Sequence, residues 1–365
     1  MKTPVKTLLK GALAGVAALA ATAGPSAAQN LMISASLPQV HMWVGQVLDP
    51  FATKMEERTD LTFTRFYAGE LVGVGRGLDA LQGGTVDIIS PLLAPYIPGA
   101  FPLTDVSQLP VYGTDSAQIT RAFQKLMDSD VELKDGKTFY QYEIEPKNIV
   151  AWALGASGPY VINTTSKEIT SPADFQGLPL RAGAALQTMT LENLGVNPVT
   201  MPAAQAYEAL SRKTIEGILL SVADWKSYSM TELLKYSIEG VALGHWESYH
   251  AISKSSWDSL TEEQQRIFDE TIRETALENA EFIQKQYVEV RETAEAAGTK
   301  FVQAEDLPQD LRDHIATAAV ATWKQWIETL EADGHPARKT AQLWSELVLA
   351  EGGELPPGVA EYLAD

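Results

Sequence analysis

The sequence has 365 residues, of which 45% are hydrophobic, and it carries a formal net charge of −19 and no cysteine. This length is too great for one ordinary domain, and the apolar fraction is sufficient for a sizeable core. The negative charge argues against a nucleic-acid partner, and the lack of cysteine excludes disulfide bonds, thiolate metal sites and cysteine nucleophiles.

Residues 1–28 have the pattern of a cleaved signal peptide. A start with Lys2, Lys6 and Lys10 precedes the apolar stretch GALAGVAALAATAG, which is shorter than the roughly 20 residues of a membrane-spanning helix. Small residues then lead to Ala28, after which we predict cleavage. No cysteine follows that could carry a lipid anchor. We therefore predict export to the periplasm without stable membrane insertion.

Strand and helix patterns alternate along the next segment. Apolar runs predict strands at 31–37, 61–67 and from residue 86 onward, with a helix over 44–59. Such alternation favours parallel pairing and an α/β domain. The longer apolar stretch at 148–164 predicts one long strand in the centre of a sheet.

The last third of the chain is dominated by helical patterns. One pattern runs from Ser259, which forms a capping-box signature with Glu262, to Gly298 at a helix end. A helix of this length would measure about 54 Å, more than one domain of this size, so we expect it to contact two domains. Two further helices are predicted over 307–334 and 337–353.

The sequence contains no convincing catalytic motif. The glycine-rich segment 73–77 lacks dinucleotide-binding spacing, and the segment GASGP at 155–159 lacks the G-x-S-x-G pattern of a nucleophile elbow. The five histidines are scattered and form no H-x-x-x-H pair. We therefore predict no enzyme, no cofactor and no metal site.

Arg181 is the most informative single residue. It ends the short apolar strand LPLR and stands directly before a helical segment. Ligands of open parallel sheets bind beyond the carboxyl ends of strands, and a guanidinium matches a carboxylate through two parallel hydrogen bonds. The residues alone leave two interpretations open: a clamp for a ligand carboxylate, or an ion pair with a nearby Asp or Glu.

The segments SPADFQGLPLR, LGVNPVTMP and AYEALSRKTIEG, in this order, resemble the signature region of the substrate-binding proteins of TRAP transporters (tripartite ATP-independent periplasmic transporters, the DctP-type family). The resemblance extends to FYAGELVGVGRGLDALQGGTVDI near the start and WKQWIETLEADGHPARKTAQLW near the end. It therefore covers nearly the whole chain after the predicted signal peptide.

This resemblance implies an α/β, two-lobed periplasmic binding protein fold (type II-like) with a long bridging helix. It also implies that Arg181 binds the carboxylate of a small organic acid, which is delivered to a large and a small TRAP membrane subunit. We assign the chain to four parts: a signal peptide at 1–28, a first lobe at 29–156 and 248–285, a second lobe at 157–247 and 286–345, and a C-terminal tail at 346–365.

The chain departs from the family pattern around the implied ligand. Leu220, Ala184 and Ala203 stand where relatives place polar or bulky aromatic groups, Val161 replaces a second arginine, and Ser90 is the only hydroxyl in its strand where sugar-acid binders have a carboxylate. A hydroxyl-rich ligand would lose its partners in such a site. These departures favour a monocarboxylate with an apolar or aromatic body, such as a 2-oxo acid or an aromatic acid.

Aromatic side chains close to strand ends are candidates for the walls of the site. They are Trp225, Trp43, His41, Tyr96 and Tyr160. We favour Trp225, because its strand is expected to lie beside the strand of Arg181. For each of them a role in the core or hinge is the alternative.

Three alternatives to this functional hypothesis remain. In the first, the ligand is a zwitterionic compatible solute of the ectoine or betaine kind, with its cationic centre on tryptophan faces. In the second, the chain serves an ATP-driven importer through the same two-lobed mechanism. In the third, it is an exported enzyme on this scaffold, which the missing nucleophile, metal and base cluster disfavour.

Overall fold

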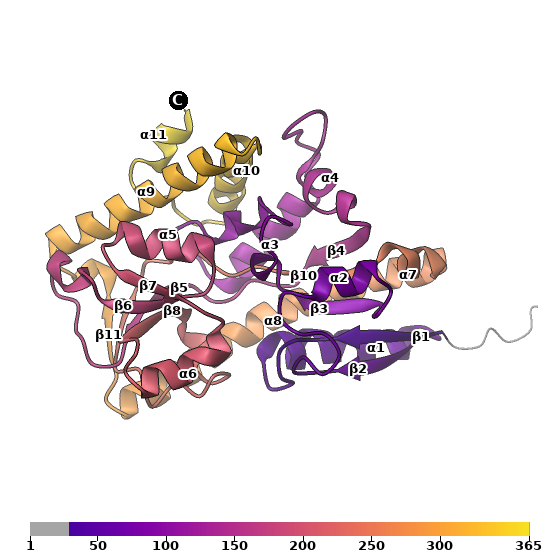
Figure 1. Ribbon diagram of the computed structural model, residues 1–365, viewed down its shortest axis with the longest axis horizontal. Helices are drawn as coiled ribbons and strands as arrows, with labels where there is room; N and C mark the ends of the chain where they lie inside the picture. Colours follow the sequence, from indigo (N-terminus) through magenta and orange to yellow (C-terminus); the bar gives the residue numbers. More distant parts are fainter. Residues whose placement is uncertain (1–28, 365) are drawn as a thin grey trace, which may run out of the picture.

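The computed structural model describes residues 29–364, which form two α/β lobes connected by a long helix (Figure 1). The signal peptide predicted for residues 1–28 lies outside this part of the chain. Each lobe is organised around one β-sheet, in agreement with the alternating strand and helix patterns. No helix among residues 29–364 combines the length and the apolar composition that crossing a membrane requires.

The first lobe contains a five-stranded sheet. Its strand β1 pairs in parallel with β2 and with β3, whereas β10 lies antiparallel between β3 and β4. The strands in spatial order are β2 (Thr62–Phe66), β1 (Asn30–Ser34), β3 (Ile88–Leu92), β10 (Tyr249–Ser253) and β4 (Ile149–Ala153). The helices are α1 (Asp49–Arg58), α2 (Gly77–Gln82), α3 (Ser116–Met127), α4 (Phe139–Glu143) and α7 (Lys254–Ser259).

The second lobe contains a six-stranded sheet. Strand β6 pairs in parallel with β7 and β8, and β5 lies antiparallel between β8 and β9. The strands in spatial order are β11 (Lys300–Gln303), β9 (Tyr236–Glu239), β5 (Tyr160–Thr164), β8 (Gly217–Ser221), β6 (Pro179–Ala182) and β7 (Asn197–Thr200). Its helices are α5 (Ala185–Asn193) and α6 (Ala203–Ser211).

Two extended segments, 154–159 and 244–248, cross between the lobes side by side. They are joined by hydrogen bonds from the amide of Leu154 to the oxygen of Ser248 (3.0 Å) and from the amide of Ser157 to the oxygen of Trp246 (2.9 Å). The single strand predicted over 148–164 is therefore wrong: the chain forms β4 and β5, which belong to different sheets. Gly155, with φ +110°, breaks the pleat between them.

The long helix α8 (Glu262–Ala296) contacts both lobes, as the sequence predicted (Figure 1). Its 35 residues correspond to about 52 Å. On the first lobe, Arg273 forms an ion pair with Asp128; on the second, Gln286 Nε2 donates to the main-chain oxygen of Ala223 over 2.7 Å. Its N-cap is Thr261 rather than the predicted Ser259, which instead ends α7.

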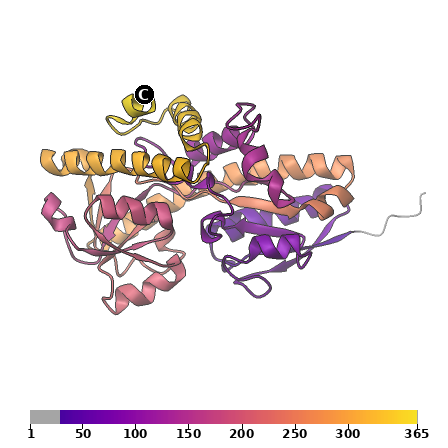
Figure 2. The same ribbon diagram turned by 45° about the horizontal axis from the view of Figure 1, so that its top comes forward.

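The C-terminal helices α9 (Gln309–Ala332), α10 (Ala337–Ala350) and α11 (Val359–Ala364) lie over the second lobe and the junction between the lobes (Figure 2). Helix α9 packs against α5 of the second lobe, yet its Trp323 donates through Nε1 to the oxygen of Pro110 in the first lobe (2.8 Å). Helix α10 packs against α3, where the rings of Phe123 and Trp344 lie 6.2 Å apart. The segment 286–345 assigned to the second lobe thus includes α10, which contacts α3 of the first lobe as well as α9, and the bounds of the predicted parts remain a prediction.

Candidate functional site

Arg181 is buried at the interface of the lobes, with 1% of its surface exposed. Its Nε donates to the main-chain oxygen of Met201 (2.9 Å) and its Nη1 to that of Leu219 (3.2 Å). Within residues 29–364, no Asp or Glu oxygen lies within 4.0 Å of its charged nitrogens. A buried charge without an ion-pair partner is costly, so this arrangement is suited to an anion that enters from outside.

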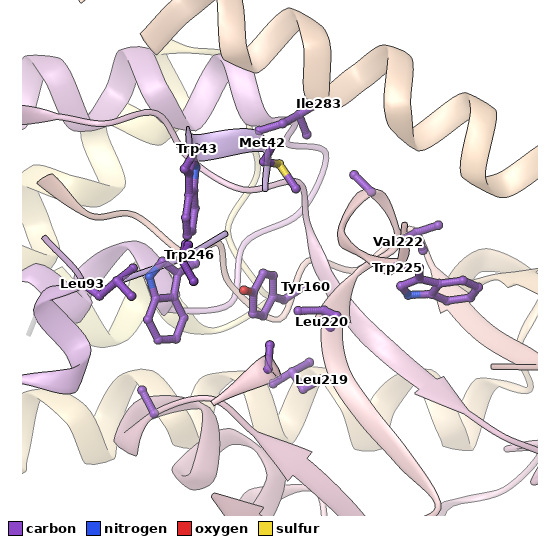
Figure 3. Packing of buried hydrophobic residues seen from close by; sticks show 14 of the residues in the cluster. Met42, Trp43, Leu93, Tyr160, Leu219, Leu220, Val222, Trp225, Trp246 and Ile283 are labelled. Carbon is purple, nitrogen blue, oxygen red and sulfur yellow. The ribbon is translucent and has the colours of Figure 1, made fainter. Parts of the chain in front are cut away.

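A cavity of about 80 Å³ lies next to the Arg181 side chain, between the lobes. Its walls come from both lobes and are rich in aromatic rings, namely Trp43, Tyr96, Tyr160, Tyr228 and Trp246. Trp43, Trp246 and Tyr160 gather on one side of the view in Figure 3. Apolar contacts from Leu93, Pro202 and Ala203 complete a surface that can surround a small planar or branched molecule.

The two tryptophans present ring surfaces rather than free donors to the cavity. The indole Nε1 of Trp43 donates to the oxygen of Gly155 (3.0 Å), and that of Trp246 donates to Ser248 Oγ (3.3 Å). The rings of Trp246 and Tyr96 lie 5.2 Å apart at 45°. Since both indole N–H groups have internal partners, the tryptophans contribute apolar area and shape.

The electrostatics of the site are set by burial and by the single positive charge. Burial raises the pKa of Tyr96 and of Tyr160, while the charge of Arg181 partly opposes both shifts. Burial likewise raises the pKa of Asp224 to about 7, again opposed by Arg181. The phenols therefore stay neutral near pH 7, and Arg181 is the full positive charge that a bound anion meets.

Four of the nine candidate ligand-binding residues predicted from the sequence line this cavity together: Arg181, Trp43, Tyr160 and Ala203. Tyr96, which was also considered, lines it too. Ala184 does not; it lines a separate, wider groove of about 840 Å³ that shares Tyr96 and Pro202 with the cavity.

Leu220, His41 and Ser90 do not line the cavity. Leu220 is a buried residue of β8 paired with Val161 of β5. Ser90 Oγ is bonded to the imidazole of His250 (2.9 Å), inside the first lobe. His41 contacts the cavity residue Tyr228 through a hydrogen bond of 3.0 Å, so it acts from behind the wall.

Trp225, the favoured candidate from the sequence, is not brought to the cavity. Strand β8 does neighbour β6, as expected, but the short helix at Val222–Trp225 turns the chain back. The Trp225 ring is fully buried and stacks on Phe301 of β11, with ring centres 5.7 Å apart. Figure 3 shows it pointing away from Tyr160 and the other aromatic residues.

Two aromatic wall residues, Tyr228 and Trp246, were missed by the sequence analysis. Tyr228 lies three residues after Trp225, in the same segment SVADWKSY, and takes the place in the cavity that was assigned to the tryptophan. Trp246 lies in the second crossing segment, flanked by the buried polar residues His245 and Glu247. In the sequence, the available signal was a tryptophan between a histidine and a glutamate in the segment GHWES.

Residues 29–364 contain no group of three His, Cys, Asp or Glu side chains arranged to hold a metal ion. The cavity thus offers one buried guanidinium, neutral phenols and aromatic walls. Such a site can bind a small anion and enclose it between two lobes.

Residues 33–329 match the family described as bacterial extracellular solute-binding protein, family 7 (DctP). The chain belongs to this family. The resemblance to TRAP substrate-binding proteins is therefore confirmed, and with it the assignment to a transport family rather than to an enzyme family.

Solved TRAP solute-binding proteins share the two-lobed fold of this TRAP substrate-binding protein. One from a marine metagenome, specific for aromatic acid ligands and in complex with metahydroxyphenylacetate, is 21% identical (TM-score 0.78, 88% of this chain and 99% of that one). One from Rhodoferax ferrireducens, in complex with copurified benzoate, is 23% identical, with a TM-score of 0.76, and the match covers 88% of this chain and 98% of that one.

Among curated relatives, a monocarboxylate 2-oxoacid-binding periplasmic protein of Nostoc sp. is 27% identical over 226 residues, 60% of this TRAP substrate-binding protein and 58% of the relative. A C4-dicarboxylate-binding periplasmic protein of Rhodobacter capsulatus is 26% identical over 185 residues, 50% of the chain and 52% of the relative. The chain thus spans about half the length of these curated relatives.

Proposed function

We propose that the protein is the periplasmic receptor of a TRAP transporter, that it encloses a small organic carboxylate between its lobes, and that it delivers this ligand to the large and small membrane subunits. The observation that carries the proposal is the buried Arg181. Its hydrogen bonds go to main-chain oxygens, and within residues 29–364 no carboxylate oxygen lies within 4.0 Å of its charged nitrogens. A ligand carboxylate supplies the missing charge.

The favoured ligand is a monocarboxylate with an apolar or aromatic body, such as an aromatic acid or a 2-oxo acid. The support comes from the walls, in which Trp43, Trp246 and Ala203 present carbon surface. Each Å² of apolar ligand surface buried there contributes about 25 cal/mol. A sugar acid would leave several hydroxyls unpaired, at a cost of about 1–3 kcal/mol each.

The relatives agree with this ligand class without defining it for this chain. Solved relatives were found with benzoate and with metahydroxyphenylacetate, and a curated relative binds 2-oxoacids. Another solved relative holds β-D-glucuronate, so the fold alone does not select the ligand. The choice therefore depends on the walls of this cavity.

A zwitterionic compatible solute is the second candidate. It is favoured by the faces of Trp43 and Trp246, which can take a cationic centre while Arg181 holds the carboxylate. Both ligand classes place a carboxylate on the same residue, so they differ in the body of the ligand rather than in the clamp.

A thermal-shift panel tests the proposal. It contains benzoate, phenylacetate, 2-oxoisovalerate, succinate, glucuronate and ectoine, each titrated into the mature protein. A ligand at 100 times its dissociation constant adds about 2.7 kcal/mol to the unfolding free energy. We expect the largest shift from benzoate, phenylacetate or 2-oxoisovalerate. The largest shift from ectoine would favour the zwitterion, and that from glucuronate would refute the proposed ligand class.

A further inference from the structure

A hydrogen bond joins the two lobes directly beside the cavity. His41 follows β1 in the first lobe, and Tyr228 follows the Val222–Trp225 turn in the second. His41 Nε2 and the Tyr228 hydroxyl lie 3.0 Å apart, and their rings meet edge to face at 5.4 Å. Of the two residues, Tyr228 lines the cavity that also holds Arg181.

The direction of this bond is fixed by a third residue. The main-chain amide of Trp43 donates to His41 Nδ1 over 3.2 Å, so Nδ1 is an acceptor and carries no hydrogen. Complete burial lowers the pKa of His41 to about 3, so the ring is neutral near pH 7. The single ring hydrogen is therefore on Nε2, and it is donated to the Tyr228 oxygen.

Because the Tyr228 oxygen accepts from His41, its own hydrogen must point elsewhere. Within residues 29–364, no oxygen or nitrogen takes this hydrogen in a hydrogen bond. Asp224 is the neighbouring carboxyl, with Oδ1 3.9 Å from His41 Nε2, and no hydrogen bond joins it to Tyr228. The donor is therefore available to a ligand in the cavity.

We infer that the Tyr228 hydroxyl, oriented by His41, donates a hydrogen bond to a second oxygen of the bound carboxylate ligand, a hydroxyl or oxo group on the body of the molecule. Tyr228 thereby selects ligands that carry such an oxygen. This inference rests on the proposed function, in which Arg181 holds the carboxylate. Tyr228 contacts the ligand and sets its specificity, and His41 is a positioning residue that acts through Tyr228.

Tyr228 is partly buried, and a ligand that covers its hydroxyl without offering the second oxygen leaves this donor unpaired. Such a loss costs about 1–3 kcal/mol, which corresponds to roughly 5- to 150-fold in affinity. A ligand with the oxygen also bridges Arg181 of the second lobe and a tyrosine held by His41 of the first. The hydrogen bond that joins the two lobes thus orients the group that discriminates between ligands.

Matched ligand pairs measure this discrimination by calorimetry. The probes are phenylacetate against mandelate, benzoate against 3-hydroxybenzoate, and isovalerate against 2-hydroxy- and 2-oxoisovalerate. We expect the wild type to prefer the oxygen-bearing member at least about fivefold in one or more sets. Tyr228→Phe should reduce the ratio of the two affinities within that set to near one. Tyr207→Phe, at an exposed tyrosine of α6, should leave this affinity ratio unchanged.

Variants of His41 test the positioning role. His41→Phe removes the donor to Tyr228, and we expect it to lower the affinity ratio between the oxygen-bearing ligand and its matched partner. Simple structural damage would instead weaken the binding of both ligands equally. His41→Gln, which can again offer an N–H group, should restore part of the ratio. Circular dichroism melting verifies that each variant is folded.

The possible failures are distinguishable. If several carboxylates bind but the wild type shows no preference within any set, or if the preference survives in Tyr228→Phe, this inference is overturned and the proposed function stands. If none of the carboxylates binds the wild type, the proposed ligand class is overturned and the inference falls with it.

Discussion

The indole Nε1 of Trp43 donates a hydrogen bond to the main-chain oxygen of Gly155 over 3.0 Å. This bond joins a wall of the cavity beside Arg181 to one of the two segments that cross between the lobes. The amide of Gly155 is held as well, because it donates to Glu247 Oε1 of the other crossing segment (3.0 Å). The shape of the cavity and the conformation of the crossing segments are therefore coupled.

Replacing Gly155 should destabilise the fold. Its φ of +110° is unfavourable for any residue with a Cβ, and an added Cβ would approach the main-chain oxygen of Ala276 in α8 to 2.9 Å. We expect Gly155→Ala to lower the unfolding free energy by about 1–3 kcal/mol in urea denaturation. Gly73→Ala is the control, because its Cβ meets nothing within 4 Å. Equal stability of the two variants would contradict the strain at Gly155.

Glu247 should make stability depend on pH. Burial raises its pKa to about 8 from 4.5, although main-chain amides including those of Ser248 and Gly155 oppose the shift. Between these values the unfolded chain releases the proton and the folded chain keeps it. The unfolding free energy should therefore fall as the pH rises from about 4.5 to 8, by up to about 1.4 kcal/mol per pH unit from this group.

The comparison of Glu247→Gln with the wild type isolates this contribution. The variant retains an oxygen acceptor for the amide of Gly155 but cannot ionise. Its advantage over the wild type in unfolding free energy should grow across the same pH window and then become constant. Glu281→Gln, at an exposed position of α8, should show no such trend. A pH-independent difference between Glu247→Gln and wild type would show that the carboxyl is ionised throughout.

Filling the cavity should abolish binding, whereas filling the outer groove should not. Ala203 lines the cavity of about 80 Å³, so a phenyl ring at this position would occupy the space of the ligand. Ala185 is exposed and lines only the wider groove. In calorimetry we expect no binding to Ala203→Phe and near-normal affinity in Ala185→Phe. The reverse result would place the ligand in the groove.

Much of the fold could be predicted because local patterns and global topology agree. The alternation of strands and helices predicted the α/β class, the family resemblance implied the two lobes, and the apolar periodicity predicted the three long C-terminal helices. The strand at 148–164 was misjudged because an uninterrupted apolar run cannot reveal that Gly155 and Pro159 lead the chain into a second sheet. The N-cap at Thr261 was missed because Ser259 offers an equally good signature two residues earlier.

The site was predicted less completely than the fold. Arg181 and Tyr160 lie on regular strands, so their places at the lobe interface followed from chain order and resemblance. Trp225 and Tyr228 lie in an irregular turn, where one change of direction decides which aromatic ring enters the cavity. No periodicity predicts such a turn, because its path is set by packing against Phe301 and α8.

Ligand binding should close the lobes. His41 and Tyr228 are joined by a hydrogen bond across the lobe interface, and opening would break it. Small-angle X-ray scattering of the mature protein should give a smaller radius of gyration with a saturating ligand than without. An unchanged radius, together with tight binding in calorimetry, would mean that the lobes do not move on binding.

The claim that Arg181 holds the ligand carboxylate is tested most directly by calorimetry of the wild type, Arg181→Ala and Arg181→Lys with the tightest ligand of the panel. Arg212→Ala, at an exposed arginine following α6, is the matched control. Loss of the buried partner should cost about 2–5 kcal/mol of binding free energy, or roughly 30- to 5,000-fold in affinity. The Arg181→Lys variant should also bind the ligand poorly, since a lysine side chain lacks the planar fork of a guanidinium. Near-wild-type affinity in a folded Arg181→Ala variant would contradict the clamp and show that Arg181 is structural.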